Sequence, residues 1–172
     1  GHPTPEEFDA ALKPLMPMAP FELTDYVGID VALHGLEYFA QVLSKDYQPS
    51  EAILAYLKSG NLGKKTGKGF YDWSKGRPTI DLAKATREYD INDLIALQVN
   101  EATKLLEEGV ADDPKQIDLA MANGGGSPFG PFALAQGIGY PVLLGKLDAI
   151  YKKFPLDIFK ATKTMREGNI KG

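Results

Sequence analysis

Hydrophobic residues recur along much of this chain at the spacing of an amphipathic helix. Between residues 29 and 43 the steps are three or four residues, which places the apolar side chains on one helix face. The members of this stripe are Ile29, Leu33, Leu36, Ala40 and Leu43. A longer stripe predicts a helix from Asp90 to Gly109, and its members are Leu94, Ile95, Ala102, Leu105 and Leu106.

Start and stop signals divide the rest of the chain into shorter helices. Thr4-Pro5-Glu6-Glu7 combines an N-cap threonine, a proline at the first helical position and a glutamate at the third. Asp113-Pro114-Lys115-Gln116 repeats this signature. Prolines and glycines bound further helices, which we expect at residues 20–27, 51–59, 114–123, 131–138 and 142–154. Because no set of alternating strands appears, the predicted fold class is all-α.

Three segments interrupt the helical pattern. Residues 60–78 are rich in glycine and predict a loop, in which residues 69–73 form a short extended piece. Residues 79–89 are polar, and we expect them to form a linker. Residues 124–128 are expected to break the helix that begins at Pro114, because three consecutive glycines there precede Ser127 and Pro128.

The two halves of the chain resemble each other. Residues 17–23 (PMAPFEL) align with residues 128–134 (PFGPFAL), and Gly28 then aligns with Gly139. Asp9 matches Asp118 once a two-residue gap is allowed. The repeat predicts two related helical units, residues 1–79 and 80–172.

The first unit has no counterpart of the long helix that opens the second, so we expect a chain cut inside a larger protein. The uncovered apolar face predicts either self-association or a rearrangement that fills the gap, because wet apolar surface costs about 25 cal/mol per Å².

Composition narrows the class of protein. The net charge of -4 argues against nucleic acid as a partner. The absence of cysteine excludes disulfides and thiolate metal sites, and it fits a cytoplasmic location. No apolar run approaches the roughly 20 residues of a membrane span, so no membrane association is expected.

Two stretches of the chain resemble the C-terminal domain of 3-hydroxyacyl-CoA dehydrogenases. The first contains residues 18–30 (MAPFELTDYVGID) and residues 63–72 (GKKTGKGFYD). The second contains Asn100-Glu101-Ala102, residues 105–109 (LLEEG), residues 117–121 (IDLAM) and Gly130-Pro131-Phe132. The tandem arrangement is similar to that of multifunctional fatty-acid oxidation enzymes.

The resemblance implies an oxidoreductase that converts 3-hydroxyacyl-CoA to 3-ketoacyl-CoA with NAD. Such a family pairs an N-terminal Rossmann domain with this helical region, and its catalytic His–Glu pair belongs to the Rossmann domain. No dinucleotide fingerprint is present here. We therefore expect NAD to be bound by the missing domain, no catalytic residue in this chain, and no activity from this chain alone.

The second unit departs from the family pattern. It has Ala133 and Gln136 where the first unit has Glu22 and Asp25. The first unit in turn has Ala19 where the family usually has glycine, which Gly130 retains in the second. These changes favour a structural role for the second unit.

The loop of residues 58–77 is the most basic segment of the chain. It holds six cationic residues and one acid, Asp72; the cations are Lys58, Lys64, Lys65, Lys68, Lys75 and Arg77. Glycine permits close backbone approach and lysine meets phosphate as a point charge. Given the family, we predict CoA-ester binding by Lys64, Lys65, Gly67 and Lys68. A solvated basic loop is the alternative, and a Walker P-loop is excluded because Gly69 follows Lys68.

Other candidate residues carry weaker signals. Met18, Phe21 and Leu23 are the predicted lining of an acyl pocket, with core packing as the alternative. His34 has no nearby cysteine or second histidine, so no metal site is expected. Asn100 matches a family position near the substrate, but in the second unit a surface or interhelical hydrogen bond is the preferred interpretation.

Two alternatives to a dehydrogenase part remain open. One is a non-catalytic helical module for interaction or oligomerisation. The other is a different 2- or 3-hydroxyacid dehydrogenase with a similar helical domain, against which the basic glycine loop favours a CoA ester.

Overall fold

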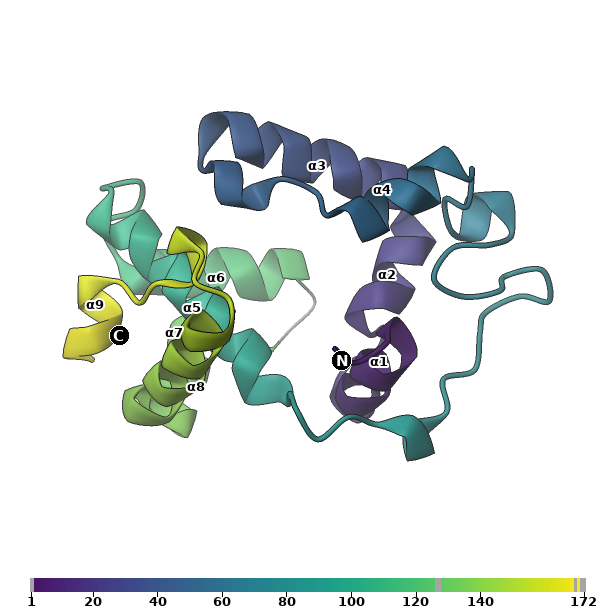
Figure 1. Ribbon diagram of the computed structural model, residues 1–172. Helices are drawn as coiled ribbons and strands as arrows, with labels where there is room; N and C mark the ends of the chain where they lie inside the picture. Colours follow the sequence, from purple (N-terminus) through teal and green to yellow (C-terminus); the bar gives the residue numbers. More distant parts are fainter. Residues whose placement is uncertain (1, 126–127, 169, 171–172) are drawn as a thin grey trace. The chain divides into compact units, whose positions relative to one another are not determined.

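The computed structural model describes residues 2–125, 128–168 and 170, which form nine α-helices in two compact units (Figure 1). Within these residues the only β-type pairing consists of two isolated bridges, one between Gly63 and Lys68 and one between Lys68 and Asp72. The all-α prediction is confirmed. The extended piece expected at residues 69–73 amounts to one of these bridges. Of the predicted break at residues 124–128, Gly126 and Ser127 lie outside the described residues.

Unit 1 covers residues 1–90 and has four α-helices among its described residues. These are α1 (Pro5–Leu12), α2 (Pro20–Val27), α3 (Ile29–Val42) and α4 (Glu51–Lys58). The predicted capping box starts α1, because the Glu7 amide donates to Thr4 Oγ1 and the Thr4 amide donates to Glu7 Oε2. Ser50 caps α4 by accepting from the Ile53 amide.

Unit 2 covers residues 91–172 and opens with the longest helix, α5 (Ile91–Glu107). It continues with α6 (Pro114–Gly125), α7 (Pro131–Ile138), α8 (Tyr140–Lys153) and α9 (Lys163–Glu167). The last helix was not predicted, because five residues are too few to show a periodic pattern. Helix α8 begins two residues earlier than expected, with Pro141 at its second position, where a missing amide costs nothing.

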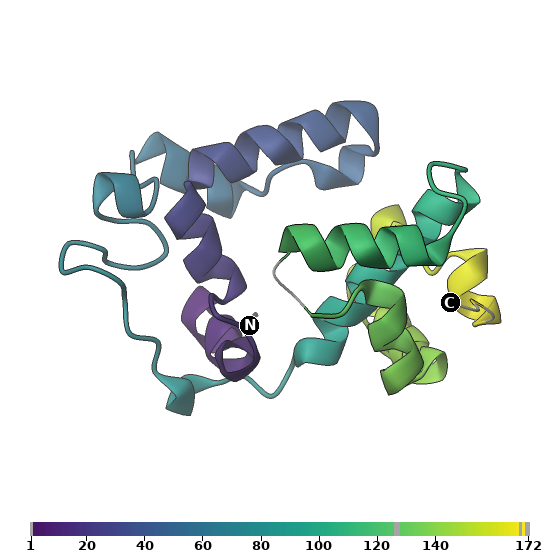
Figure 2. The same cartoon turned by 180° about the vertical axis from the view of Figure 1, so that it is seen from behind.

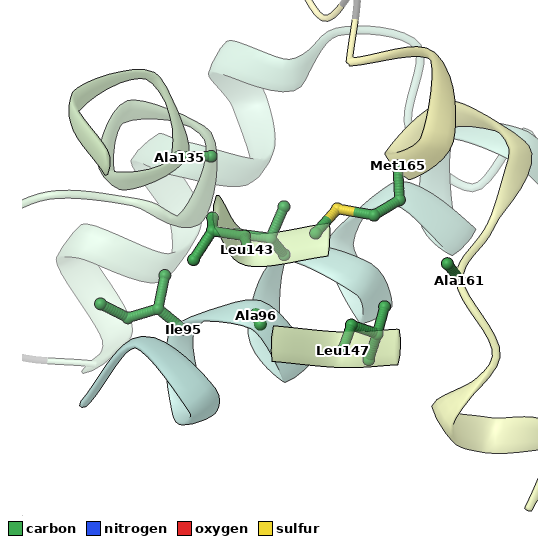
Figure 3. Packing of buried hydrophobic residues seen from close by; sticks show 8 residues of the cluster. Ile95, Ala96, Ala135, Leu143, Leu147, Ala161 and Met165 are labelled. Atoms are coloured by element: carbon green, nitrogen blue, oxygen red, sulfur yellow. The ribbon is translucent and has the colours of Figure 1, made fainter. Parts of the chain in front are cut away.

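The main core of unit 2 lies where α5 crosses α7 and α8 (Figure 3). Ile95, Ala96 and Val99 from α5 pack in one cluster with Leu143 and Leu147 from α8. Ala135 from α7, Ala161 from the segment before α9 and Met165 from α9 complete it. A long amphipathic helix thus covers a pair of shorter ones, and this arrangement supplies the apolar burial that stabilises the unit.

The segment expected to be a linker belongs to unit 1. Ile80 is buried in a cluster with Ala10 and Ala19 of unit 1. The sequence had predicted the boundary between the two units just before this residue, between positions 79 and 80. The Thr86 amide donates to the Glu7 carbonyl, and Lys84 pairs with Glu6 at 2.7 Å. Both ribbon views show the chain returning from the loop after α4 to run alongside α1 (Figures 1 and 2). Apart from Ile80 and Leu82 the segment has little apolar signal, so its packing depends on tertiary contacts.

Candidate functional site

The glycine-rich loop of unit 1, residues 60–76, is fastened to helix α2 by one buried carboxylate. Asp25 is fully buried and accepts three hydrogen bonds of 2.9 Å each. The donors are the Phe70 amide, the Tyr71 amide and the indole N–H of Trp73. Because one buried side chain accepts from two loop amides and from Trp73, Asp25 holds the loop in one position.

Two glycines allow the loop to approach Asp25 this closely. A Cβ atom on Gly69 would lie 2.2 Å from Asp25 Oδ1, and one on Gly63 would lie 2.2 Å from the Asp25 carbonyl oxygen. Gly63 also has φ of +96°, a conformation that side chains disfavour. The glycine spacing of this segment therefore serves the packing of the loop onto α2, in addition to any contact with a ligand.

The predicted CoA-ester residues lie together on this loop. Lys64, Lys65 and Lys68 are exposed, and Gly67 turns the chain between them with φ of +78°. Lys65 pairs with Asp30 of α3 at 2.5 Å, and this contact holds the pKa of Asp30 below its usual value. The ammonium of Lys64 lies 4.3 Å from the centre of the Tyr26 ring. Lys64 and Lys68 have no ion pair with any described residue, so they are the better placed of the three for an anion.

Arg77 has a structural partner that sequence reasoning missed. Its Nε donates to Glu22 Oε1 at 2.5 Å, while Lys13 meets Glu22 Oε2 at 2.6 Å. Burial alone raises the pKa of Glu22, but the hydrogen bonds from Arg77 and Lys13 outweigh it, and the net pKa is lowered. No local signal in the sequence links residues 13, 22 and 77, because the pairing arises only when the loop folds back.

The predicted acyl-pocket residues occupy different surroundings. Phe21 packs edge-on against Phe8 and Phe70, with ring centres 5.8 and 4.9 Å apart. Leu23 is 45% exposed, and Met18 is half-buried before α2. Phe21 and Leu23 are two positions apart on one helix and so face different directions. The structure does not bring these two side chains together, and their role in an acyl pocket stays a prediction.

In each unit one carboxylate caps the N-terminus of a helix of the repeat, which is α2 in unit 1 and α7 in unit 2. Asp9 accepts from the Phe21 and Glu22 amides at 2.9 and 2.8 Å. Asp118 accepts from the Phe132 and Ala133 amides at 2.8 and 2.9 Å. The preceding residues, Ala19 and Gly130, have no side-chain oxygen, so the neighbouring helix supplies the cap.

Tyr71 distinguishes the cap of unit 1 from that of unit 2. Its hydroxyl donates to Asp9 Oδ2 at 2.8 Å, and burial followed by this contact raises the pKa of Tyr71. Burial also raises the pKa of Asp9. Tyr71 therefore stays a neutral hydrogen-bond donor that ties the loop to α1 as well as to α2.

The described residues of unit 2 contain no copy of this loop anchor. Gln136, the counterpart of Asp25, is exposed. Asn100 is buried and bonds the segment before α9, donating to the Lys160 carbonyl and accepting from the Thr162 amide. Of the two interpretations from the sequence, a surface hydrogen bond is wrong because Asn100 is buried, and the structure shows instead bonds between α5 and the segment that precedes α9. The arrangement supports a structural part for unit 2.

The chain's own residues do not fit a dinucleotide. A Rossmann site needs a strand that runs into a glycine turn and a helix N-terminus, and the described residues contain no such strand. Two of the loop glycines, Gly63 and Gly69, are instead packed on Asp25. His34 is exposed on α3, and no group of three potential metal ligands occurs among residues 2–125, 128–168 and 170. Within those residues no helix is both long enough and apolar enough to span a membrane.

The chain consists of two related helical units, and the first of them has a basic loop. Comparison with known families identifies the class of domain that has this arrangement. The family model for the 3-hydroxyacyl-CoA dehydrogenase C-terminal domain matches residues 1–73 and 90–170. The chain belongs to this family. The unmatched residues 74–89 include the segment that returns to α1.

Relatives with curated names agree with the family. The chain is 29% identical over 164 residues to a fatty acid oxidation complex subunit alpha of Vibrio campbellii, covering 87% of this chain and 23% of the relative. It is 30% identical over 188 residues to a peroxisomal bifunctional enzyme of Cavia porcellus, covering 88% and 26%. The chain thus spans about a quarter of the length of these relatives.

A solved structure shows the same fold. The crystal structure of 3-hydroxybutyryl-CoA dehydrogenase from Escherichia coli K12 superposes with a TM-score of 0.79. The alignment covers 95% of this chain and 54% of that one, at 22% identity. At this identity the likeness concerns the helical architecture.

Proposed function

We propose that this chain is the C-terminal part of an NAD-dependent 3-hydroxyacyl-CoA dehydrogenase, which converts a 3-hydroxyacyl-CoA to a 3-ketoacyl-CoA. The observation that carries the proposal is the family match over both units, joined to an exposed lysine pair on an anchored loop. NAD and the catalytic groups would be supplied by a Rossmann domain outside these residues. The part of residues 1–172 would be to close the CoA-ester pocket and to support assembly.

The anchored loop suits a phosphate-bearing substrate for two reasons. Asp25 and Tyr71 fix its backbone, so ordering the loop on binding would cost little conformational entropy. Lys64 and Lys68 then present positive charge on a chain that is negative overall, which draws an anionic CoA ester toward this part of the surface. Lys65 would act mainly through Asp30, by holding the loop against α3.

The reaction is tested by oxidation of NADH with acetoacetyl-CoA, comparing the full reading frame with residues 1–172. We expect activity in the full protein and none in the shorter chain. Absence of activity in both folded proteins would favour the non-catalytic interaction module or another substrate class.

The loop is tested by the double variant Lys64→Ala/Lys68→Ala in the full protein. We expect the KM for acetoacetyl-CoA to rise about 3- to 10-fold, as for the loss of about 1 kcal/mol of exposed charge pairing. The KM for NADH should not change. The matched control is Lys115→Ala/Lys152→Ala, which removes the same charge from exposed positions of unit 2. Equal KM values in the two double variants would contradict the assignment.

The remaining expectations are a cytoplasmic location and homo-oligomeric assembly, and both stay predictions. The interaction module has one observation in its favour, which is that α3 exposes large apolar side chains, among them Val31, Tyr38 and Phe39.

A further inference from the structure

Tyr26, in the last turn of α2, presents an aromatic ring beside the basic loop. The residue is 48% exposed. The Lys64 ammonium lies 4.3 Å from the centre of the ring, and the Trp73 ring lies 6.3 Å away at an interplanar angle of 54°. A flat apolar surface is therefore next to a positive charge that has no acidic partner among the described residues.

The neighbours of this ring are fixed in place by hydrogen bonds. The Trp73 indole donates to buried Asp25 at 2.9 Å, and the Trp73 amide donates to the Gly67 carbonyl at 2.9 Å. The Gly63 amide donates to the Lys68 carbonyl at 2.8 Å, which brings the backbone of Lys68 next to that of Lys64. The ring and the backbone that carries the lysines are thus positioned before a ligand arrives, so binding would cost little conformational entropy.

The internal repeat shows that α2 does not need an aromatic side chain at this position. Helices α2 and α7 have eight residues each, and Gly28 and Gly139 follow them. Counting back from these glycines places Gly137 where unit 1 has Tyr26. A Cβ atom on Gly137 would meet nothing within 4 Å, so the position faces open space in unit 2. The aromatic ring is found in the unit that has the anchored basic loop.

A flat ring beside a cation suits a ligand that joins a planar base to a phosphate. Aromatic side chains stack on the π-face of a base, and lysine meets phosphate as a point charge. A CoA ester has both groups in its adenosine 3′-phosphate, at the end of the molecule remote from the thioester. The chemistry of Tyr26 and Lys64 therefore matches this end of the ester.

We propose that Tyr26 and Lys64 bind the adenosine 3′-phosphate end of the CoA ester, a step that rests on the proposed function. The adenine stacks on the Tyr26 ring. The Lys64 ammonium leaves the ring for the phosphate, and Lys68 adds charge beside it. This exchange is favourable because base stacking is stronger than an exposed cation–π contact and because the ammonium gains an anionic partner.

The binding test uses the chain of residues 1–172 and two probes in NMR titrations of the loop amides. Adenosine 3′,5′-bisphosphate supplies a base and charge, whereas inorganic pyrophosphate supplies charge alone. Tyr26→Leu removes the ring and Tyr26→Phe keeps it. The matched control is Tyr38→Leu, because Tyr38 is also an exposed tyrosine of unit 1, at 60%, but packs against Phe39 on α3.

We expect Tyr26→Leu to raise the Kd for the bisphosphate about 5-fold, as for the loss of one stacked base at an exposed site. The Kd for pyrophosphate should not change in this variant. Tyr26→Phe should restore binding of the bisphosphate, and Tyr38→Leu should have no effect. Lys64→Ala/Lys68→Ala should weaken the binding of both probes, because it removes charge rather than the stacking surface.

A second test, in the full protein, distinguishes the end of a CoA ester from a free adenine nucleotide. Acetoacetyl-pantetheine carries the thioester without the nucleotide. Tyr26→Leu should lower the ratio of kcat/KM for acetoacetyl-CoA to kcat/KM for acetoacetyl-pantetheine about 5-fold. An unchanged ratio, together with weaker binding of the bisphosphate, would assign the ring to a free nucleotide and overturn the proposal.

Failure of this proposal and failure of the proposed function give different results. If Tyr26→Leu binds the bisphosphate as the unmodified chain does, the stacking role is refuted. The loop keeps its assignment in that case, provided that the double lysine variant still weakens both probes. If the full protein does not reduce acetoacetyl-CoA, the dehydrogenase proposal fails, and the NMR titrations alone decide the role of Tyr26. Absence of binding of either probe to the unmodified chain would also overturn the proposal.

Discussion

Replacing Asp25 with alanine should loosen the glycine-rich loop more than any other single change in unit 1. The carboxylate is fully buried and has three donors, two of them backbone amides of the loop and the third the indole of Trp73. Alanine leaves these donors without an acceptor. It also removes the side chain that lies nearest to a Cβ placed on Gly69.

The magnitude follows from the number of bonds and from how far the loop can relax. A hydrogen bond to a charged group contributes about 1.5–3 kcal/mol, and a buried donor left unpaired costs about 1–3 kcal/mol. Full loss of three such bonds would exceed 4 kcal/mol, but the Phe70 and Tyr71 amides can regain water once the loop opens. We therefore expect Asp25→Ala to lower the free energy of unfolding of unit 1 by about 3–5 kcal/mol.

Trp73 makes the measurement specific to unit 1. It is the only tryptophan of the chain and is 7% exposed, so its emission reports on the loop. In denaturant titrations the midpoint of the Trp73 signal should fall, and the native emission should move to longer wavelength. Gln136→Ala is the matched control, because Gln136 holds the equivalent, exposed position in unit 2. If Asp25→Ala shifts the midpoint no more than Gln136→Ala does, the anchoring role of Asp25 is refuted.

Two further predictions concern the ion cluster and the repeat. Glu22→Gln should destabilise unit 1 by about 2 kcal/mol at pH 7. This is less than the loss expected when a fully buried ion pair is broken, because Lys13 and Arg77 are partly exposed. The folded pKa of Glu22 is lowered, so its contribution is present above the ordinary value of 4.5 and is lost as pH falls through the folded pKa. In Trp73-monitored titrations the gap between the two proteins should close as pH falls below 4.5 and through the lowered folded pKa of Glu22, and a gap that is constant with pH would argue against the ion cluster. Gly130→Ala should lower the stability of unit 2 by about 2 kcal/mol, since the new Cβ would lie 2.3 Å from Asp118 Cα. Hydrogen exchange in α7 should report this loss, and unchanged protection there would show that the helices can separate at no cost.

Local signals in the sequence were sufficient for most of the helical architecture. Periodic apolar residues marked α3 and α5, and the Thr4 box located the start of α1. The repeat was visible because prolines and glycines punctuate both halves alike. These features act over three to seven residues, a range in which backbone geometry and side-chain spacing determine the outcome.

The site depended on contacts between residues far apart in the chain. The sequence indicated a basic glycine loop, but only the fold showed that Asp25 anchors it, that Lys65 meets Asp30 and that Arg77 meets Glu22. The same limit explains why residues 79–89 looked like a linker although Ile80 is buried. Local spacing therefore determined which segments are helices, whereas burial and ion pairing across 35 to 55 positions decided which charges remain for a ligand. The physical reason is that a buried carboxylate pairs with the donors that the fold places next to it, and local sequence patterns do not show which donors these are.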